Sequence, residues 1–104
     1  MIIYSVTVTL DQNIEQDWKK WMNDVHIPDV MMTGFFRAAY LQRLLEPQPD
    51  AGLVTYNVQY ECDSMEQLER YQQEAAPALQ ADHTERYKDR FVAFRTILER
   101  EKSY

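Results

Sequence analysis

A chain of 104 residues provides for one domain, which we place at residues 1–104, and a single hydrophobic core must hold it together. Its apolar fraction of 45% and aromatic fraction of 12% exclude a disordered or low-complexity protein. Eleven Lys and Arg against seventeen Asp and Glu give a net charge of −6, which disfavours nucleic acid and anionic lipid as partners.

The N-terminal residues 2–10 alternate apolar and polar side chains with the period of two that is typical of a strand. This stretch lacks the basic start and the continuous apolar block of a signal peptide. No segment approaches the roughly 18 apolar residues of a membrane span. We therefore expect a cytoplasmic protein with no membrane partner.

An apolar stripe at helical spacing follows the first strand. Asp11 or Asn13 is suited to cap this helix. The stripe consists of Ile14, Trp18, Trp21, Met22 and Val25. Because Pro28 cannot continue a regular helix and restrains the residue before it, we predict that the helix ends near His26 and that an irregular segment runs to Gly34.

Two further strands are predicted over about residues 35–45 and 54–62, separated by a turn-rich loop. The second of them alternates clearly, and it directs Cys62, the only cysteine, toward the core as an inert buried thiol. A single cysteine also excludes an intrachain disulfide. Ser64 and Gln67 fit a capping box that opens a second helix. Pro77 predicts a kink or two helical pieces joined near Ala76, before a last strand over about residues 90–99.

This order of elements predicts an α+β fold, a ferredoxin-like βαββαβ sandwich with an antiparallel sheet, in which the first and third strands are central and both helices cover one face. For the uncovered face the alternation predicts two groups. The central strands contribute Ile3, Ser5, Thr7, Thr9, Leu53, Thr55, Asn57, Gln59 and Glu61. The edge strands are expected to contribute Phe35, Arg37, Ala39, Leu41, Arg43, Leu45, Phe91, Ala93, Arg95 and Ile97. Such a mixed apolar surface favours a face-to-face homodimer over an ordinary solvated face.

Two histidines and one aspartate are the candidates for catalysis. His26 is placed to act as a proton shuttle, although the end of a helix also suits a histidine as a cap. Asp29 is placed to orient His26 or to cap the next turn. His83 lies four residues from Leu79 and from Tyr87, so it faces the sheet, either as a core residue or as a functional one. The absence of a spaced ligand set argues against a metal site.

Six aromatic residues are expected between the helices and the sheet, where they would line a pocket for a planar organic ligand or simply fill the core. They are Trp18, Trp21, Tyr4, Tyr56, Tyr60 and Tyr71. With only two glycines, the chain has no phosphate loop and no dinucleotide fingerprint, so we expect no cofactor.

Several runs of residues resemble an uncharacterised bacterial domain-of-unknown-function family. They are Trp18-x-x-Trp21-Met22-x-x-x-His26-Ile27-Pro28-Asp29-Val30-Met31-x-Thr33-Gly34-x-Phe36, Tyr56-x-Val58-Gln59-Tyr60, Arg70-Tyr71-Gln72, Ala76-Pro77-Ala78-Leu79, His83 and Phe91-Val92-Ala93-Phe94-Arg95-Thr96. That family is similar to the dimeric α/β-barrel superfamily, in which two ferredoxin-like subunits press their sheets together. The resemblance implies the fold and the dimer, and it carries over no catalytic residue.

The same superfamily includes antibiotic-biosynthesis monooxygenases, ethyl tert-butyl ether degradation proteins and muconolactone isomerases. The order of Trp21, His26-x-Pro28 and Gly34 is similar to a pattern in the ether degradation proteins. Two functions stay open. The first is a small-molecule protein, as a cofactor-independent monooxygenase or isomerase in which His26 or His83 moves a proton. The second is a non-catalytic ligand-binding or protein-interaction module.

Overall fold

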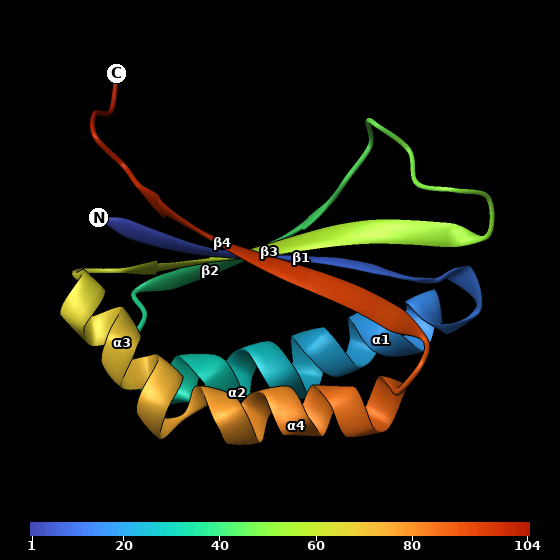
Figure 1. The fold of residues 1–104 in the computed structure, drawn as a ribbon, viewed down its shortest axis with the longest axis horizontal. Coiled ribbons are helices and arrows are strands. Elements are labelled where there is room, and N and C mark those ends of the chain that lie inside the picture. The colour runs from blue at the N-terminus through green and yellow to red at the C-terminus, as the bar shows by residue number, and fades with distance from the viewer.

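Four antiparallel strands form one twisted sheet in the order β2-β3-β1-β4, and helices cover only one of its faces (Figure 1). The computed structural model describes all residues from 1 to 104. The strands are β1 (Ile2–Asp11), β2 (Ala38–Arg43), β3 (Leu53–Cys62) and β4 (Phe91–Glu99). The helical segments are the 3₁₀ turn η1 (Gln12–Ile14), α1 (Glu15–Trp21), the π-helical turn η2 (Met22–His26), α2 (Ile27–Met32), α3 (Met65–Glu74) and α4 (Ala76–Tyr87). The predicted ferredoxin-like α+β fold is confirmed, with β1 and β3 in the centre.

The first helix does not end near His26, and the prediction of an irregular segment up to Gly34 is wrong. The chain stays helical from α1 through η2 and α2, because the π-helical turn widens the backbone at this point. The backbone N–H of Ile27 donates to the carbonyl of Met22, five residues earlier. This wider turn accommodates Pro28, which lacks an N–H and clashes with the preceding turn of a regular helix.

The second helical region is divided as Pro77 predicted. Ser64 caps α3, since its hydroxyl accepts the backbone N–H of Gln67 at 3.2 Å. The helix stops at Glu74, and α4 begins at Ala76 with Pro77 in its first turn, where a missing N–H costs no helical hydrogen bond. Tyr71 at the end of α3 and His83 in α4 are both buried against the sheet.

The sheet register confirms the predicted phase of the central strands and overturns that of both edge strands. Arg95 pairs with Val6, and Leu41 pairs with Val58. Directly opposed residues share a face, and Val6 and Val58 point toward the helices. The residues wrongly assigned to the open face therefore lie on the helix side of the sheet. They are Ala39, Leu41 and Arg43 of β2 and Phe91, Ala93, Arg95 and Ile97 of β4.

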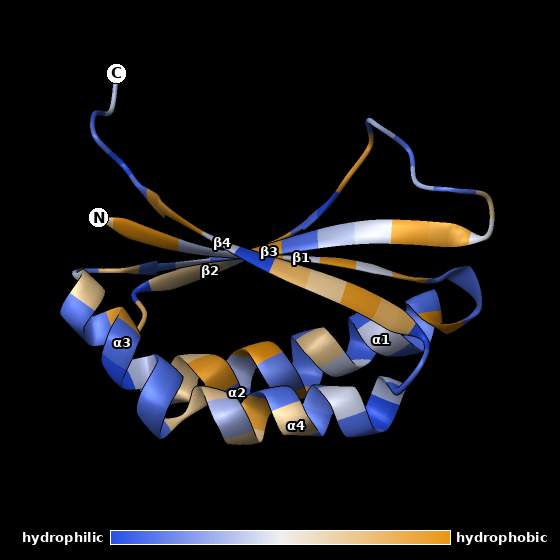
Figure 2. Ribbon diagram, viewed as in Figure 1, coloured by the Kyte–Doolittle hydropathy of each residue, from blue (hydrophilic) through white to orange (hydrophobic).

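Along the helices that cover one face of the sheet, hydrophilic and hydrophobic residues alternate (Figure 2). The open face has a polar network on its two central strands, β1 and β3. In the centre the Asn57 amide donates to the hydroxyl of Ser5 at 2.8 Å and to that of Thr7 at 3.1 Å. Thr9 and Thr55 share a hydrogen bond of 2.8 Å. Large side chains are left exposed around this network, namely Tyr40, Leu53, Val92, Phe94 and Leu98.

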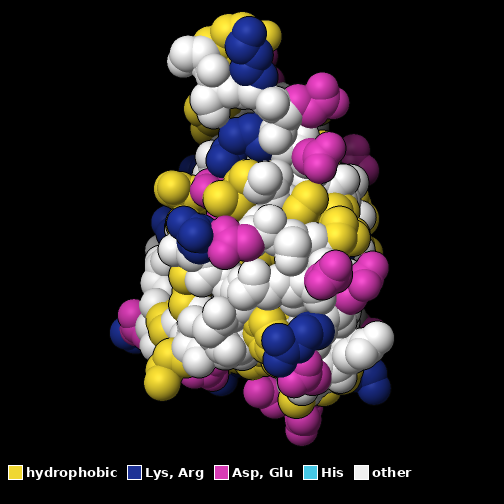
Figure 3. All heavy atoms as spheres, turned by 90° about the vertical axis from the view of Figure 1, so that its left-hand side faces the viewer, with side chains coloured by type: hydrophobic (Ala, Val, Ile, Leu, Met, Phe, Trp, Pro, Cys, Tyr) yellow, Lys and Arg dark blue, Asp and Glu magenta, His cyan; other side chains and the backbone are white.

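The hydrophobic core lies between the helices and the sheet, and its largest fully buried side chains include Trp18, Leu10 and Leu68. Cys62 is buried, as the alternation of β3 predicted, and burial raises the pKa of its thiol. At the end of the molecule that carries α3, charged side chains of both signs are intermixed (Figure 3). No helix is both long and apolar enough to cross a membrane.

Candidate functional site

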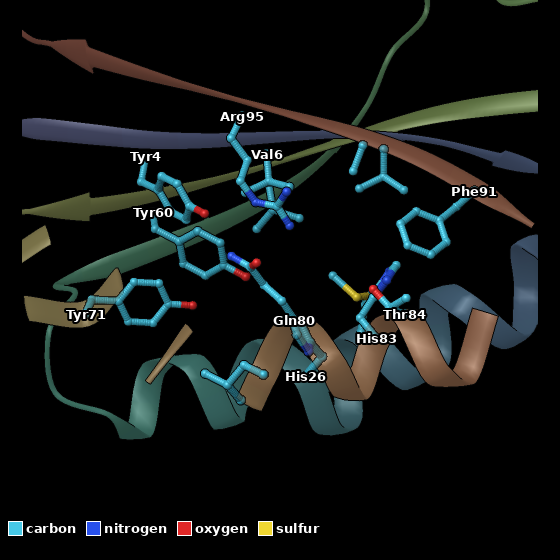
Figure 4. A pocket seen from close by; sticks show the side chains of 15 residues that line it. Tyr4, Val6, His26, Tyr60, Tyr71, Gln80, His83, Thr84, Phe91 and Arg95 are labelled. Carbon is cyan, nitrogen blue, oxygen red and sulfur yellow. The ribbon is translucent and has the colours of Figure 1, made fainter. Parts of the chain in front are cut away.

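A cavity of about 50 Å³ lies between the sheet and the helices, and β1, β3 and β4 contribute to its wall (Figure 4). It holds roughly three or four times the space that one water molecule needs, and it is smaller than the roughly 150 Å³ that accepts a benzene ring. Its wall is made by Tyr4, Val6, Val8, Met22, His26, Val58, Tyr60, Tyr71, Leu79, Gln80, His83, Thr84, Phe91, Ala93 and Arg95.

The cavity opens between α4 and β4. The two most open residues of its wall, Thr84 on α4 and Arg95 on β4, are both exposed, whereas Tyr4, Tyr60 and Tyr71 are buried. Gln80, one helical turn before Thr84, is half-buried at the same edge. A ligand with a ring therefore enters only if the flexible side chains at this mouth turn outward.

His83 is held in one tautomer. The indole N–H of Trp18, which can only donate, forms a hydrogen bond of 2.9 Å to Nε2 of His83. The neutral imidazole consequently carries its own proton on Nδ1, an atom with no hydrogen-bond partner in the chain. Burial, the nearby His26 and Arg95 together lower the pKa of His83 to about 4. At neutral pH His83 therefore offers the cavity a fixed N–H donor.

His26 is the more accessible of the two imidazoles. It is the last residue of the π-helical turn, stacked on Trp21 with ring centroids 5.0 Å apart and 5.8 Å from the ring of His83. Burial lowers its pKa, which the carboxylates of Asp29 and Asp82 oppose and the guanidinium of Arg95 reinforces. A neutral imidazole with a free lone pair is suited to accept a proton.

Three tyrosines form the far end of the cavity, and their hydroxyls point into it (Figure 4). Tyr4, Tyr60 and Tyr71 come from β1, β3 and α3, and their rings lie close to one another, with 6.0 Å between the centroids of Tyr4 and Tyr71. None of these hydroxyls bonds to another protein group, and no fully enclosed polar side-chain atom lacks a partner. The three hydroxyls are therefore accessible from the cavity. Burial raises the pKa of Tyr60 and of Tyr71, which keeps both protonated.

The structure brings only part of the predicted site to the cavity. His26, His83, Tyr4, Tyr60 and Tyr71 line it, whereas the other predicted residues do not. Trp18 donates a hydrogen bond to His83, and Trp21 stacks on His26, outside the cavity wall. Tyr56 lies elsewhere, where its hydroxyl donates to Glu15 at 2.6 Å. Asp29 is exposed and reaches His26 only through its charge.

Sequence reasoning missed the residues at the mouth, above all Arg95, Gln80 and Thr84. Arg95 was assigned to the opposite face because β4 has apolar residues on both sides and no clear alternation. Gln80 lies three residues before His83 and Thr84 lies four residues after Gln80, so helical spacing could have indicated first Gln80 and then Thr84. No group of three or more His, Cys, Asp or Glu side chains is placed to hold a metal ion.

The fold and the cavity define a ferredoxin-like protein with a small enclosed space between its helices and its sheet. Residues 1–101 match the family model described as Domain of unknown function (DUF4286), and the chain belongs to that family. The resemblance to an uncharacterised family is thereby confirmed. No curated protein matches the sequence significantly.

Solved structures share the fold at low sequence identity. A dimeric ferredoxin-like protein from an uncultured marine organism has a TM-score of 0.73 at 12% identity, with 100% of this chain and 98% of that chain covered. An ethyl tert-butyl ether degradation family protein from Bacillus halodurans has a TM-score of 0.67 at 15% identity, with coverage of 96% and 99%. HapK from Hahella chejuensis has a TM-score of 0.72 at 11% identity, with coverage of 100% and 97%. These similarities establish the fold alone.

Proposed function

We propose that this protein binds a small organic molecule in the cavity between helices and sheet and catalyses a proton transfer on it without a cofactor, as an isomerase does. The observation that carries the proposal is the convergence of two imidazoles and three tyrosine hydroxyls on one aromatic-walled space. Unpaired polar groups that converge in an apolar pocket are the usual mark of a ligand site. The one similar structure from the ethyl tert-butyl ether degradation family supports a small-molecule role through its fold alone.

In this proposal His26 is the base. Its neutral imidazole takes a proton from a carbon beside a carbonyl group, which leaves an enolate and an imidazolium. The imidazolium then returns the proton to a different carbon of the same molecule, so that no oxidant or other co-reactant is consumed. The tyrosine hydroxyls and the Nδ1–H of His83 are the donors that stabilise the enolate oxygen. A cofactor-independent monooxygenase would begin with the same deprotonation and then consume dioxygen.

The small volume of the cavity favours one alternative, a non-catalytic interaction module whose helices and sheet stay closed. With about 50 Å³ available, the described conformation has no room for an aromatic ring. The two functions differ in whether the mouth side chains Gln80 and Arg95 move aside for a ligand. Binding of a compound that contacts the tyrosines would exclude the closed interaction module, and proton exchange then distinguishes catalysis from non-catalytic ligand binding.

The test combines binding with proton exchange. Small aromatic ketones and lactones are screened by thermal shift, and compounds that bind are incubated with the protein in D₂O while NMR follows loss of the proton beside the carbonyl. We expect the wild type to accelerate this exchange, and His26→Gln to bind the same compounds with the exchange rate lowered by about 100-fold or more. Asn23→Gln, an exposed change in the same turn, is the control.

Two results would contradict the proposal. If no compound stabilises the wild type, the interaction-module function replaces it. If compounds bind and exchange is equally fast with His26→Gln, then His26 is not the base. Oxygen uptake that accompanies turnover would assign the monooxygenase chemistry in place of isomerisation.

We also propose that two copies associate through the open sheet face. Exposed apolar side chains on its edges, Phe94 and Val92 on β4 and Tyr40 on β2, are 60%, 70% and 51% accessible and share one surface. Large apolar side chains left exposed on both edges of a sheet face that no helix covers favour association with a partner. The structural neighbour from a marine organism is described as dimeric, which agrees with the proposal.

A further inference from the structure

We infer that the cavity takes a small planar ligand that carries one anionic oxygen group, with Arg95 as its charge partner. This inference rests on the proposed ligand-binding function and adds to it the class of compound. It follows from the charges of the cavity wall, from the pairing of the arginines and from the position of the guanidinium.

The cavity wall has one fixed charge, and it is positive. Among the wall residues there is no Asp and no Glu, so Arg95 has no counter-ion there. His26 and His83 are neutral at physiological pH, because the pKa of each is lowered. A molecule with a net charge of −6 thus has a locally positive cavity. Such a site attracts an anion and repels a cation.

Arg95 also differs from most other arginines of the chain. Five of the seven arginines lie within 4.0 Å of a carboxylate, and these are Arg37, Arg70, Arg86, Arg90 and Arg100. Arg95 and Arg43 form no such pair although seventeen acidic residues are present. Arg43, on β2, lies outside the cavity wall. Arg95 is therefore the one unpaired guanidinium that is available to a ligand in this cavity.

The guanidinium of Arg95 reaches in from β4 above Gln80 and beside Val6 (Figure 4). Its charge acts on groups at both ends of the cavity, since it adds to the lowering of the pKa of His83 at one end and opposes the rise that burial causes in the pKa of Tyr71 at the other. A guanidinium binds a carboxylate through two parallel hydrogen bonds, and a nearby tyrosine hydroxyl adds a further donor. Once the mouth has opened to make room, the aromatic wall can pack against the flat face of a ring attached to that group. Because the side chain is exposed and unpaired, it can turn outward to admit the ring.

The test uses pairs of compounds that have the same shape and differ in charge. Benzoate and benzamide, and 2-naphthoate and 2-naphthamide, are compared by ligand-observed NMR and calorimetry. We expect each acid to bind the wild type about ten-fold more tightly than its amide, as one charge-assisted contact provides. Arg95→Gln should remove this preference, because it weakens binding of each acid about ten-fold more than binding of its amide. Arg95→Lys should retain part of it, and Arg43→Gln should retain all of it.

Four outcomes overturn the inference, and the first three separate it from the proposed function. If the amides bind as tightly as the acids, the cavity binds ligands but does not select an anion. If the acid preference survives in Arg95→Gln, another group binds the anion. If neither member of any pair binds while neutral ketones or lactones do, the ligand class is wrong and the proposed function stands. If nothing binds at all, both fail together.

Discussion

Trp18 donates its indole proton to Nε2 of His83 at 2.9 Å, across a separation of 65 residues in the chain. This bond ties α1 to α4 and leaves His83 only one tautomer in its neutral form. Protonation of His83 would place two N–H groups against each other at this contact. The indole therefore stabilises the neutral form of His83, in addition to the effects of burial and of the nearby positive charge.

Replacement of Trp18 with Phe should raise the pKa of His83, because the donor that favours its neutral form is lost. The change also leaves a buried acceptor unpaired, so we expect the free energy of unfolding to fall by about 1–3 kcal/mol. NMR titration of the two histidines measures the pKa, with His26 in the same spectrum as an internal reference. A pKa of His83 that stays near its wild-type value would show that burial alone sets it.

Stability should decrease as the pH falls from about 6.5 to 4. In the unfolded chain the imidazole of His83 binds a proton below its ordinary pKa of 6.5, whereas in the folded protein it does so only near pH 4. The folded state is thus fully favoured above pH 6.5 and loses up to roughly 3 kcal/mol by pH 4. Denaturant unfolding at a series of pH values measures the effect. Carboxylates also titrate near pH 4, so the comparison is with His83→Gln, whose stability should depend less steeply on pH.

Two tyrosine hydroxyls should respond differently to removal. The hydroxyl of Tyr56 donates to Glu15, so Tyr56→Phe should cost about 1–2 kcal/mol of stability. The hydroxyl of Tyr60 has no protein partner, and Tyr60→Phe should change stability by less than about 0.5 kcal/mol. Thermal or chemical unfolding measures both variants. A large loss in Tyr60→Phe would mean that its hydroxyl bonds within the protein and is not available to a ligand.

The two faces of the sheet can be distinguished by a pair of charge substitutions. Phe94→Glu places a carboxylate on the open face and should weaken association of two copies by roughly 100-fold or more, while the monomer stays folded. Leu41→Glu places one on the helix side and should instead destabilise the fold by about 2 kcal/mol or more. Light scattering over a range of concentrations and chemical unfolding measure the two effects. Met32→Glu, at an 85% exposed position on α2, is the control for added charge.

A monomeric wild type at micromolar concentration would contradict the dimer. Unchanged association in Phe94→Glu would place the interface elsewhere.

The elements that the sequence predicted well are those in which one periodicity dominates. Apolar and polar residues alternate from Tyr4 onward in β1 and from Val54 onward in β3, and Ser64 opens α3 with a side-chain cap. The edge strands gave no such information, because apolar residues occupy both faces of β4. Only the pairing of Arg95 with Val6 settles its phase, and that pairing is a contact between distant parts of the chain. This is why Arg95 was assigned to the wrong face.

The cavity was only partly predictable for a similar reason. His26 and His83 are recognisable as candidates by residue type. Which aromatic side chains line the cavity with them depends on where each helix crosses each strand, and the sequence does not show this. Tyr60 reaches the cavity, whereas Tyr56, four residues earlier on the same face of β3, bonds to Glu15 instead. Alternation assigns both tyrosines to one face and contains nothing that separates them.

The π-helical turn η2 keeps the two ends of the first helical region facing the sheet. Trp18, Met22, His26 and Val30 are spaced by four residues, and in a regular helix each such step rotates by about 40° beyond a full turn. Over three steps Val30 would lie about 120° away from Trp18. Instead both are buried, 0% and 1% exposed, because the extra residue of η2 resets the rotation. A deletion of one residue between Met22 and His26 would therefore convert η2 into a regular helical turn and leave both Trp18 and Val30 facing the sheet.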